Sequence, residues 1–96
     1  MIFTVFVQNK EVINMKESPD KYVICDIQPI IGHLKQIHRN ILGLTVQTRL
    51  LERGRGWVAY AEDYGAFHTS AVINIVDNGC DLCIETVNTK YFLKKL

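Results

Sequence analysis

Several features that would identify a familiar class of protein are scarce in this 96-residue sequence. It contains only three cysteines, two prolines and one tryptophan, and its formal net charge is +1. An odd number of cysteines favours free thiols in a reducing compartment over a disulfide framework. The balanced charge excludes a chain that is strongly basic throughout, as in many nucleic-acid binders, and an acidic nucleic-acid mimic.

Long apolar runs are also missing. No stretch approaches the roughly 18 residues that a membrane span needs, and the first residues lack the basic region and cleavage site of a signal peptide. We therefore expect a cytoplasmic protein that does not contact a membrane. With 48% hydrophobic and 22% charged residues, the composition is that of a globular protein, and the length predicts a single domain over residues 1–96.

The clearest local signal is the run Asp77-Asn78-Gly79-Cys80, which separates two stretches of alternating apolar residues. Asn-Gly readily supplies two consecutive residues with positive φ, as a tight hairpin requires. With Asn78 and Gly79 as the loop, Ile75 faces Leu82 and Ile73 faces Ile84 on the core side, and Val72 lies on the other face.

Alternation predicts further strands along the chain. An N-terminal β-ribbon is expected over residues 2–8 and 11–15, followed by a strand over 22–27. The stretches 44–50, 57–61, 67–76 and 82–87 predict a meander, and a last hairpin at Asn88-Thr89 adds a fifth strand with Tyr91 and Leu93 on the core face.

From Pro29 the apolar period changes to that of a helix. The apolar side chains that then share one side of a helical wheel are Ile30, Ile31, Leu34, Ile37, Ile41 and Leu42. Pro29 suits a first helical turn, and Gly43 suits the left-handed position after the last turn. The predicted fold is therefore α+β: one amphipathic helix, an N-terminal ribbon and a C-terminal five-strand antiparallel meander. The meander can curl into a small SH3-like half-open barrel, whose open end the helix could cover.

Candidate metal and catalytic residues have simpler structural interpretations. Cys80 and Cys83 have the spacing of a zinc or redox pair, but residues three apart on a strand point to opposite faces, so we expect neither a metal nor a cofactor. His38 lies within the apolar stripe of the helix, which favours a hydrogen-bonded core residue. The run His68-Thr69-Ser70 lacks the glycine pattern of a nucleophile elbow, so no enzyme is predicted.

Basic and aromatic residues supply the candidate binding site. The turn Arg53-Gly54-Arg55-Gly56-Trp57, together with Tyr64 and Lys94, is the best contact candidate for a protein partner, because Arg, Trp and Tyr dominate interface energetics. In a competing interpretation, Trp57 packs inward and both arginines are simply solvated. A nucleic-acid site is the other alternative, with these arginines, Arg49 and the C-terminal lysines as its charges and Trp57, Tyr60 and Tyr91 as stacking platforms.

The C-terminal residues also carry a family resemblance. Thr69-Ser70-Ala71-Val72, a hairpin, and then Thr86-Val87-Asn88-Thr89-Lys90-Tyr91-Phe92-Leu93 resemble the pattern T-S-x-V and T-x-N-(S/T)-x-Y-x-L. This pattern is similar to the C-terminal end of many small phage-encoded accessory proteins. The resemblance covers about a quarter of the chain. It implies a host-takeover or anti-defence protein and supplies no catalytic residues.

Three functions remain open at this point. The first is a non-enzymatic interaction protein, such as a phage-type inhibitor that binds a bacterial defence protein, for example a CRISPR-associated one, or another host protein. The second is a small barrel that binds nucleic acid. The third, a small enzyme or a nucleotide-binding sponge, needs a pocket at the mouth of the barrel. A homodimer is compatible with each of them.

Overall fold

Alternating apolar residues form six strands in residues 19–96, the part of the chain that the computed structural model describes. In chain order the elements are β1 (Lys21–Pro29), α1 (Gln36–Ile41), β2 (Thr45–Leu50), β3 (Gly56–Ala61), β4 (Gly65–Asp77), β5 (Asp81–Thr86) and β6 (Thr89–Lys95). Each strand is antiparallel to its neighbours, in the order β1-β2-β3-β4-β5-β6.

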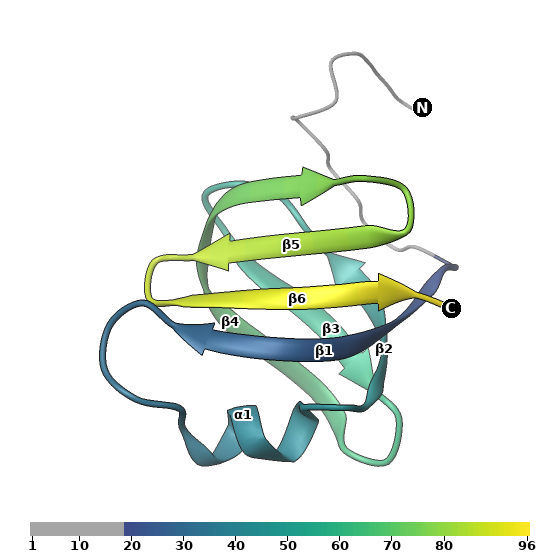
Figure 1. Cartoon of the computed structure of the whole chain (residues 1–96), viewed down its shortest axis with the longest axis horizontal. Helices are drawn as coiled ribbons and strands as arrows, with labels where there is room; N and C mark the ends of the chain where they lie inside the picture. The colour runs from purple at the N-terminus through teal and green to yellow at the C-terminus, as the bar shows by residue number, and fades with distance from the viewer. Residues whose placement is uncertain (1–18) are drawn as a thin grey trace.

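The strand β1 closes this sheet into a barrel because it pairs with both β2 and β6. Tyr22 lies opposite Val46 on one side, and Ile24 lies opposite Leu93 on the other. Figure 1 shows β1 running beside β6 across the front of the molecule, with α1 at the end of the barrel where β3 passes into β4. Closure leaves no unpaired strand edge among the described strands.

The interior of the barrel is filled by inward-facing apolar side chains around Trp57. Trp57 is fully buried, and its Nε1–H donates to the buried Thr48 hydroxyl at 3.0 Å. Its ring contacts Phe67 and Tyr91 edge to face, with ring centroids 5.3 Å and 5.5 Å away. The indole donor is thus satisfied in the core, where an unpaired polar group would be costly.

The predicted α+β class is wrong, because the described part of the chain is a closed β-barrel with one short helix. The residues 22–27 do form a strand, as predicted, within β1. This strand joins the meander through β6 and β2 and closes the predicted half-open barrel. The predicted ribbon over residues 2–8 and 11–15 lies outside the described residues.

The helix is much shorter than predicted. Pro29 ends β1 and pairs with Thr89, and the backbone N–H groups of Ile30 and Ile31 donate to the Asn88 carbonyl at 2.8 Å and 3.3 Å. These bonds hold the two residues against the β5–β6 turn, and Gly32 then has a positive φ of 79°, which a right-handed helix does not contain, so α1 begins only at Gln36. The rest of the apolar stripe is divided, because Leu34, Ile37 and Ile41 pack on the core while Ile30, Ile31 and Leu42 are exposed. Gly43 has the predicted positive φ of 86°.

The hairpin between β4 and β5 is confirmed, but its loop lies one residue further along the chain. Gly79 alone has positive φ, and Asn78 N–H donates to the Asp81 carbonyl at 2.9 Å, so Gly79 and Cys80 form the loop. Glycine at the first loop position is typical of a type II′ turn. The Asp77 carboxylate also accepts from Gly79 N–H at 2.8 Å. Ile75 therefore pairs with Ile84.

A β-bulge in β4 reverses one predicted face. The register shifts between Val72 and Asn74, so Val72 is 1% exposed and Ile73 is 49% exposed. The extra residue in the bulge interrupts the alternation on which the prediction relied. In β6, Tyr91 and Leu93 are buried as predicted, and they pair with Ile84 and Leu82.

The geometry of the β4–β5 turn makes a prediction for Gly79. Replacing it with valine should lower the free energy of unfolding by about 1–3 kcal/mol, because a β-branched residue resists φ near 90°. Gly79→Asn should cost less, since asparagine tolerates positive φ. Chemical denaturation of both variants measures the difference, and equal stability of Gly79→Val and the wild type would contradict the turn assignment.

The bulge makes a second prediction. Val72→Asp should lower the free energy of unfolding by at least about 3 kcal/mol, because it places an unpaired charge in the core. Ile73→Asp should cost about 1 kcal/mol or less, since this side chain is half exposed. Urea unfolding of the two variants tests the order, and a larger loss for Ile73→Asp would show that the bulge is misplaced.

Candidate partner-binding surface and cavity

The five residues predicted to contact a partner do not form one site. Trp57 is fully buried, so its side chain packs inward, as the competing interpretation predicted, and offers no contact surface to a partner; the role of the two arginines stays a prediction. Its strand places it on the inner face of the barrel, where it fills the core. Tyr64 is 42% exposed but lies in the connection after β3, at the opposite end of that strand from Arg55. Lys94 lies near Asp81, with 4.0 Å between Nζ and Oδ1, beside the β4–β5 turn.

The two arginines remain together in an exposed loop between β2 and β3. This loop is fixed to β4, because Gly54 N–H donates to the Val72 carbonyl at 2.8 Å and Val72 N–H donates to the Arg55 carbonyl at 2.9 Å. Arg55 also lies 3.7 Å from the carboxylate of the half-buried Glu52, and this pair contributes little to stability because the guanidinium is exposed. The backbone of the loop is thus held in place while both guanidinium groups are available to solvent.

Exposed aliphatic side chains lie beyond the arginine loop, on the other side of β4. Val87 N–H donates to the Ala71 carbonyl of β4 at 3.0 Å. The carbonyl of the next residue, Asn88, accepts hydrogen bonds from the backbone N–H groups of Ile30 and Ile31. Figure 1 shows the segments concerned on the left of the molecule: the β2–β3 loop, the middle of β4, the β5–β6 turn and the end of β1. We call this the rim surface; it comprises Arg53, Arg55, Ile73, Val87, Ile30 and Ile31.

The exposed fractions of its apolar members are large: 49% for Ile73, 51% for Val87, 46% for Ile30 and 67% for Ile31. The amino-acid pattern does not reveal these four residues as an exposed surface, because Ile73, Ile30 and Ile31 match the pattern of a buried face. Their exposure follows from the bulge in β4 and from the backbone bonds to Asn88, neither of which is encoded by alternation.

A hydrogen-bonded cluster supports the turn beneath the rim surface. The Oδ1 atom of Asn88 accepts from the hydroxyls of Ser70 and Thr89, each at 3.0 Å. Thr86 hydroxyl donates to the Thr89 carbonyl at 3.0 Å and accepts from Thr89 N–H at 3.1 Å. These are residues of the pattern that resembles the phage accessory proteins, so the structure brings the two separate halves of that pattern together.

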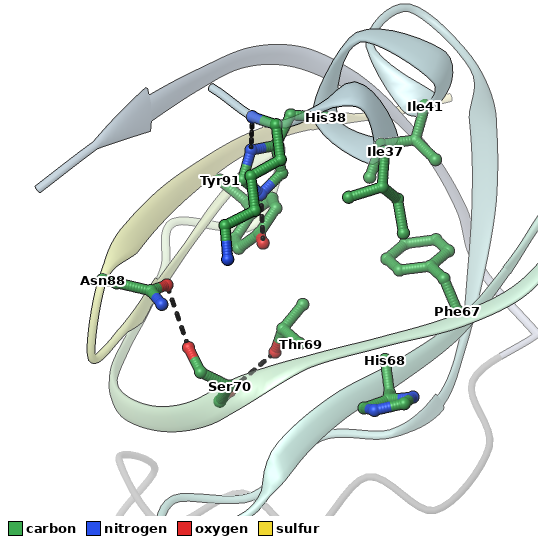
Figure 2. Close-up of a pocket in the computed structure, with 10 residues that line it drawn as sticks. Ile37, His38, Ile41, Phe67, His68, Thr69, Ser70, Asn88 and Tyr91 are labelled. Carbon is green, nitrogen blue, oxygen red and sulfur yellow. Dashed lines mark hydrogen bonds between the residues drawn. The ribbon is translucent and has the colours of Figure 1, made fainter. Parts of the chain in front are cut away.

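A cavity of about 290 Å³ opens between α1, β4 and the start of β6. Figure 2 shows Asn88, Ser70 and the Tyr91 hydroxyl on one side of it, with Ile37 and Phe67 on the other. Lys35 and Ile41 also line it, and so does His38. This is a pocket at the mouth of the barrel, the feature that the ligand-binding alternative requires.

His38 connects α1 to the wall of the cavity. Lys35 N–H donates to His38 Nδ1 at 3.0 Å, so in the neutral ring Nε2 carries the proton and faces the Tyr91 hydroxyl at 3.3 Å. Burial, and then the charge of Lys35, lower the pKa of His38. Burial raises the pKa of Tyr91, and a hydrogen bond with the Thr89 side chain partly offsets this effect. The prediction of a hydrogen-bonded core histidine is confirmed.

The other candidate catalytic and metal-binding residues do not converge. His68 is exposed and lies on the far side of β4 from Tyr91 in Figure 2, while Ser70 is bonded to Asn88. Cys25, Cys80 and Cys83 are free thiols. Within residues 19–96, no group of three or more His, Cys, Asp or Glu side chains could hold a metal ion. The expectations of no zinc and no enzymatic activity stay predictions.

The nucleic-acid alternative loses two of its three stacking platforms. Trp57 and Tyr91 are buried, so neither offers a ring face to a base. Tyr60 is 42% exposed, and the Arg49 guanidinium lies over its ring, 5.6 Å from the centroid. A base would have to displace this cation to stack on Tyr60.

Comparisons with protein-family models, with curated proteins and with solved structures found no match to this chain. The resemblance of the C-terminal residues to phage accessory proteins is therefore still a prediction. Among the described residues there is no helix that is long and apolar enough to cross a membrane.

The environment of His38 predicts a pH dependence of stability. Because its pKa is lowered in the folded state, the unfolded chain binds more protons between that value and about 6.5, and the free energy of unfolding falls as the pH drops through this window. His38→Gln should lower the melting temperature at neutral pH but reduce its change between about pH 7.5 and 5.5. His33→Gln, at an exposed position, should keep the wild-type dependence. Identical pH profiles for both variants would contradict the assignment.

Proposed function

We propose that this chain is a non-enzymatic interaction protein that binds another protein through the rim surface. The observation that supports this proposal is the exposure of Ile73, Val87, Ile30 and Ile31 beside two arginines, on a backbone fixed by hydrogen bonds to β4 and Asn88. Exposed apolar side chains that gather at one place favour a protein-binding site over a merely soluble surface. A fixed backbone limits the conformational entropy lost on binding.

Charge defines the kind of partner. Arg53 and Arg55 add two positive charges to the rim surface, and the only acidic side chain in their loop is Glu52, paired with Arg55. An arginine side chain can donate two parallel hydrogen bonds to one carboxylate. The partner that fits is therefore a protein with an apolar patch bordered by aspartate or glutamate side chains.

The identity of the partner follows only from the resemblance. If the C-terminal strands belong with the phage-encoded accessory proteins, the partner is a bacterial host or defence protein, and binding inhibits it in the host cytoplasm. The rim surface does not distinguish a defence protein from another host protein.

Substitutions on and away from the rim surface test the proposal. Arg53→Ala with Arg55→Ala, and separately Ile31→Ser with Val87→Ser, should weaken partner binding at least about tenfold, or ~1.4 kcal/mol, with folding intact. Tyr64→Ala and Lys94→Ala are matched controls at other places on the barrel, and should bind as the wild type does. A partner identified by affinity purification from a bacterial lysate and mass spectrometry would be purified and titrated calorimetrically against each variant.

Two outcomes would overturn the proposal. In the first, both rim variants bind the purified partner as tightly as the wild type, so the contact lies elsewhere. In the second, a mixed-sequence single-stranded DNA oligonucleotide binds with a steep dependence on salt that the double arginine variant abolishes, which would favour the nucleic-acid function.

A further inference from the structure

The cavity beside α1 carries hydrogen-bond donors that have no acceptor among residues 19–96. Asn88 uses Oδ1 to accept from Ser70 and Thr89, and its amide N–H groups donate no hydrogen bond to the described residues. Lys35 makes no ion pair with a carboxylate in residues 19–96. No aspartate or glutamate is among the described residues that line the cavity. This side of the cavity therefore offers positive charge and unpaired donors, a combination that attracts an anion.

The opposite side of the cavity is apolar. Ile37 and Phe67 line it, together with the fully buried Ile41 (Figure 2). Phe67 is itself fixed by edge-to-face packing on Trp57, so this wall does not depend on a ligand for its shape. A purely inorganic ion would leave the apolar wall facing water. A molecule with an apolar part can cover it and gain from its burial.

We propose that this cavity binds a small organic anion, in which a carboxylate or phosphate group is attached to an apolar body about the size of one ring. The acidic group lies between Lys35 and Asn88, and the apolar body lies against Ile37 and Phe67. The volume of about 290 Å³ is just below the range of pockets for drug-sized molecules, which limits the ligand to a small metabolite. The proposal is independent of the rim surface and of any protein partner.

The probes for the test are benzoate, phenyl phosphate and the neutral benzyl alcohol, each titrated into the ¹⁵N-labelled full chain and followed by NMR. We expect at least one anion to shift the side-chain amide signals of Asn88 and the backbone signals of Ser70 and Ile37, with a Kd of about 1 mM. Benzyl alcohol should bind at least about tenfold more weakly. The comparison of benzoate with phenyl phosphate identifies the acidic group that the cavity prefers.

Two exposed basic residues, Lys35 at the start of α1 and Arg39 in its last turn, provide the matched variants. Lys35→Gln should weaken binding of the preferred anion about tenfold, because it removes the charge that lines the cavity. Arg39→Gln removes an equal charge from α1 at a position that does not line the cavity, and should leave the Kd unchanged.

Three results would overturn the inference. They are no shift at Asn88 with either anion up to about 10 mM, equal affinity for benzyl alcohol, or equal loss of affinity in the Lys35 and Arg39 variants. The last result would show general attraction of anions to the positive charges around α1 rather than binding in the cavity.

Discussion

One turn residue, Asn88, holds three parts of the barrel in a fixed relation. Its carbonyl accepts hydrogen bonds from the backbone of Ile30 and Ile31, at the end of β1. Its side-chain oxygen accepts from Ser70 of β4 and Thr89 of β6. Buried or half-buried polar groups of this kind must be paired to be tolerated, so they define one arrangement of the turn. Both the exposed isoleucines of the rim surface and the polar side of the cavity depend on this arrangement.

The local features of the fold could be predicted from the sequence, whereas the long-range ones could not. Strands in the C-terminal part follow from alternation and turn residues, which act over a few positions. Closure of the barrel depends on the pairing of β1 (Lys21–Pro29) with β6, about 70 residues later in the chain. No local sequence pattern predicts a pairing over that distance. The start of the predicted helix failed for the same reason, since the backbone of Ile30 and Ile31 is bonded to the distant Asn88 carbonyl and does not enter a helical turn. The turn before β5 could be predicted from its Asn-Gly sequence. The bulge at Ile73 could not, and it places Val72 instead of Ile73 on the inner face of β4.

The candidate site was only partly predictable. Arg53 and Arg55 lie in an exposed loop, as glycine-rich, charged sequence indicates. Trp57 follows immediately in the sequence but enters a strand on its inner face, and the residue type alone does not distinguish a contact residue from a core residue. Asn88 belonged to a recognised pattern, yet its partners Ser70 and Ile30 are far away in the chain. Only the three-dimensional arrangement shows that this pattern builds a surface and a cavity.

Closure of the barrel also determines how the protein can bind anything. A partner commonly joins a β-protein by adding a strand to an exposed edge, and the described strands leave no such edge. Among the described residues, binding therefore has to use exposed side chains and loops rather than an added strand. The hydrogen bonds of the sheet and the packing around Trp57 can stabilise the fold without contributing to recognition. Consequently, the side chains of Arg53 and Ile31 can change with little effect on stability, so binding and folding can be altered separately in this molecule.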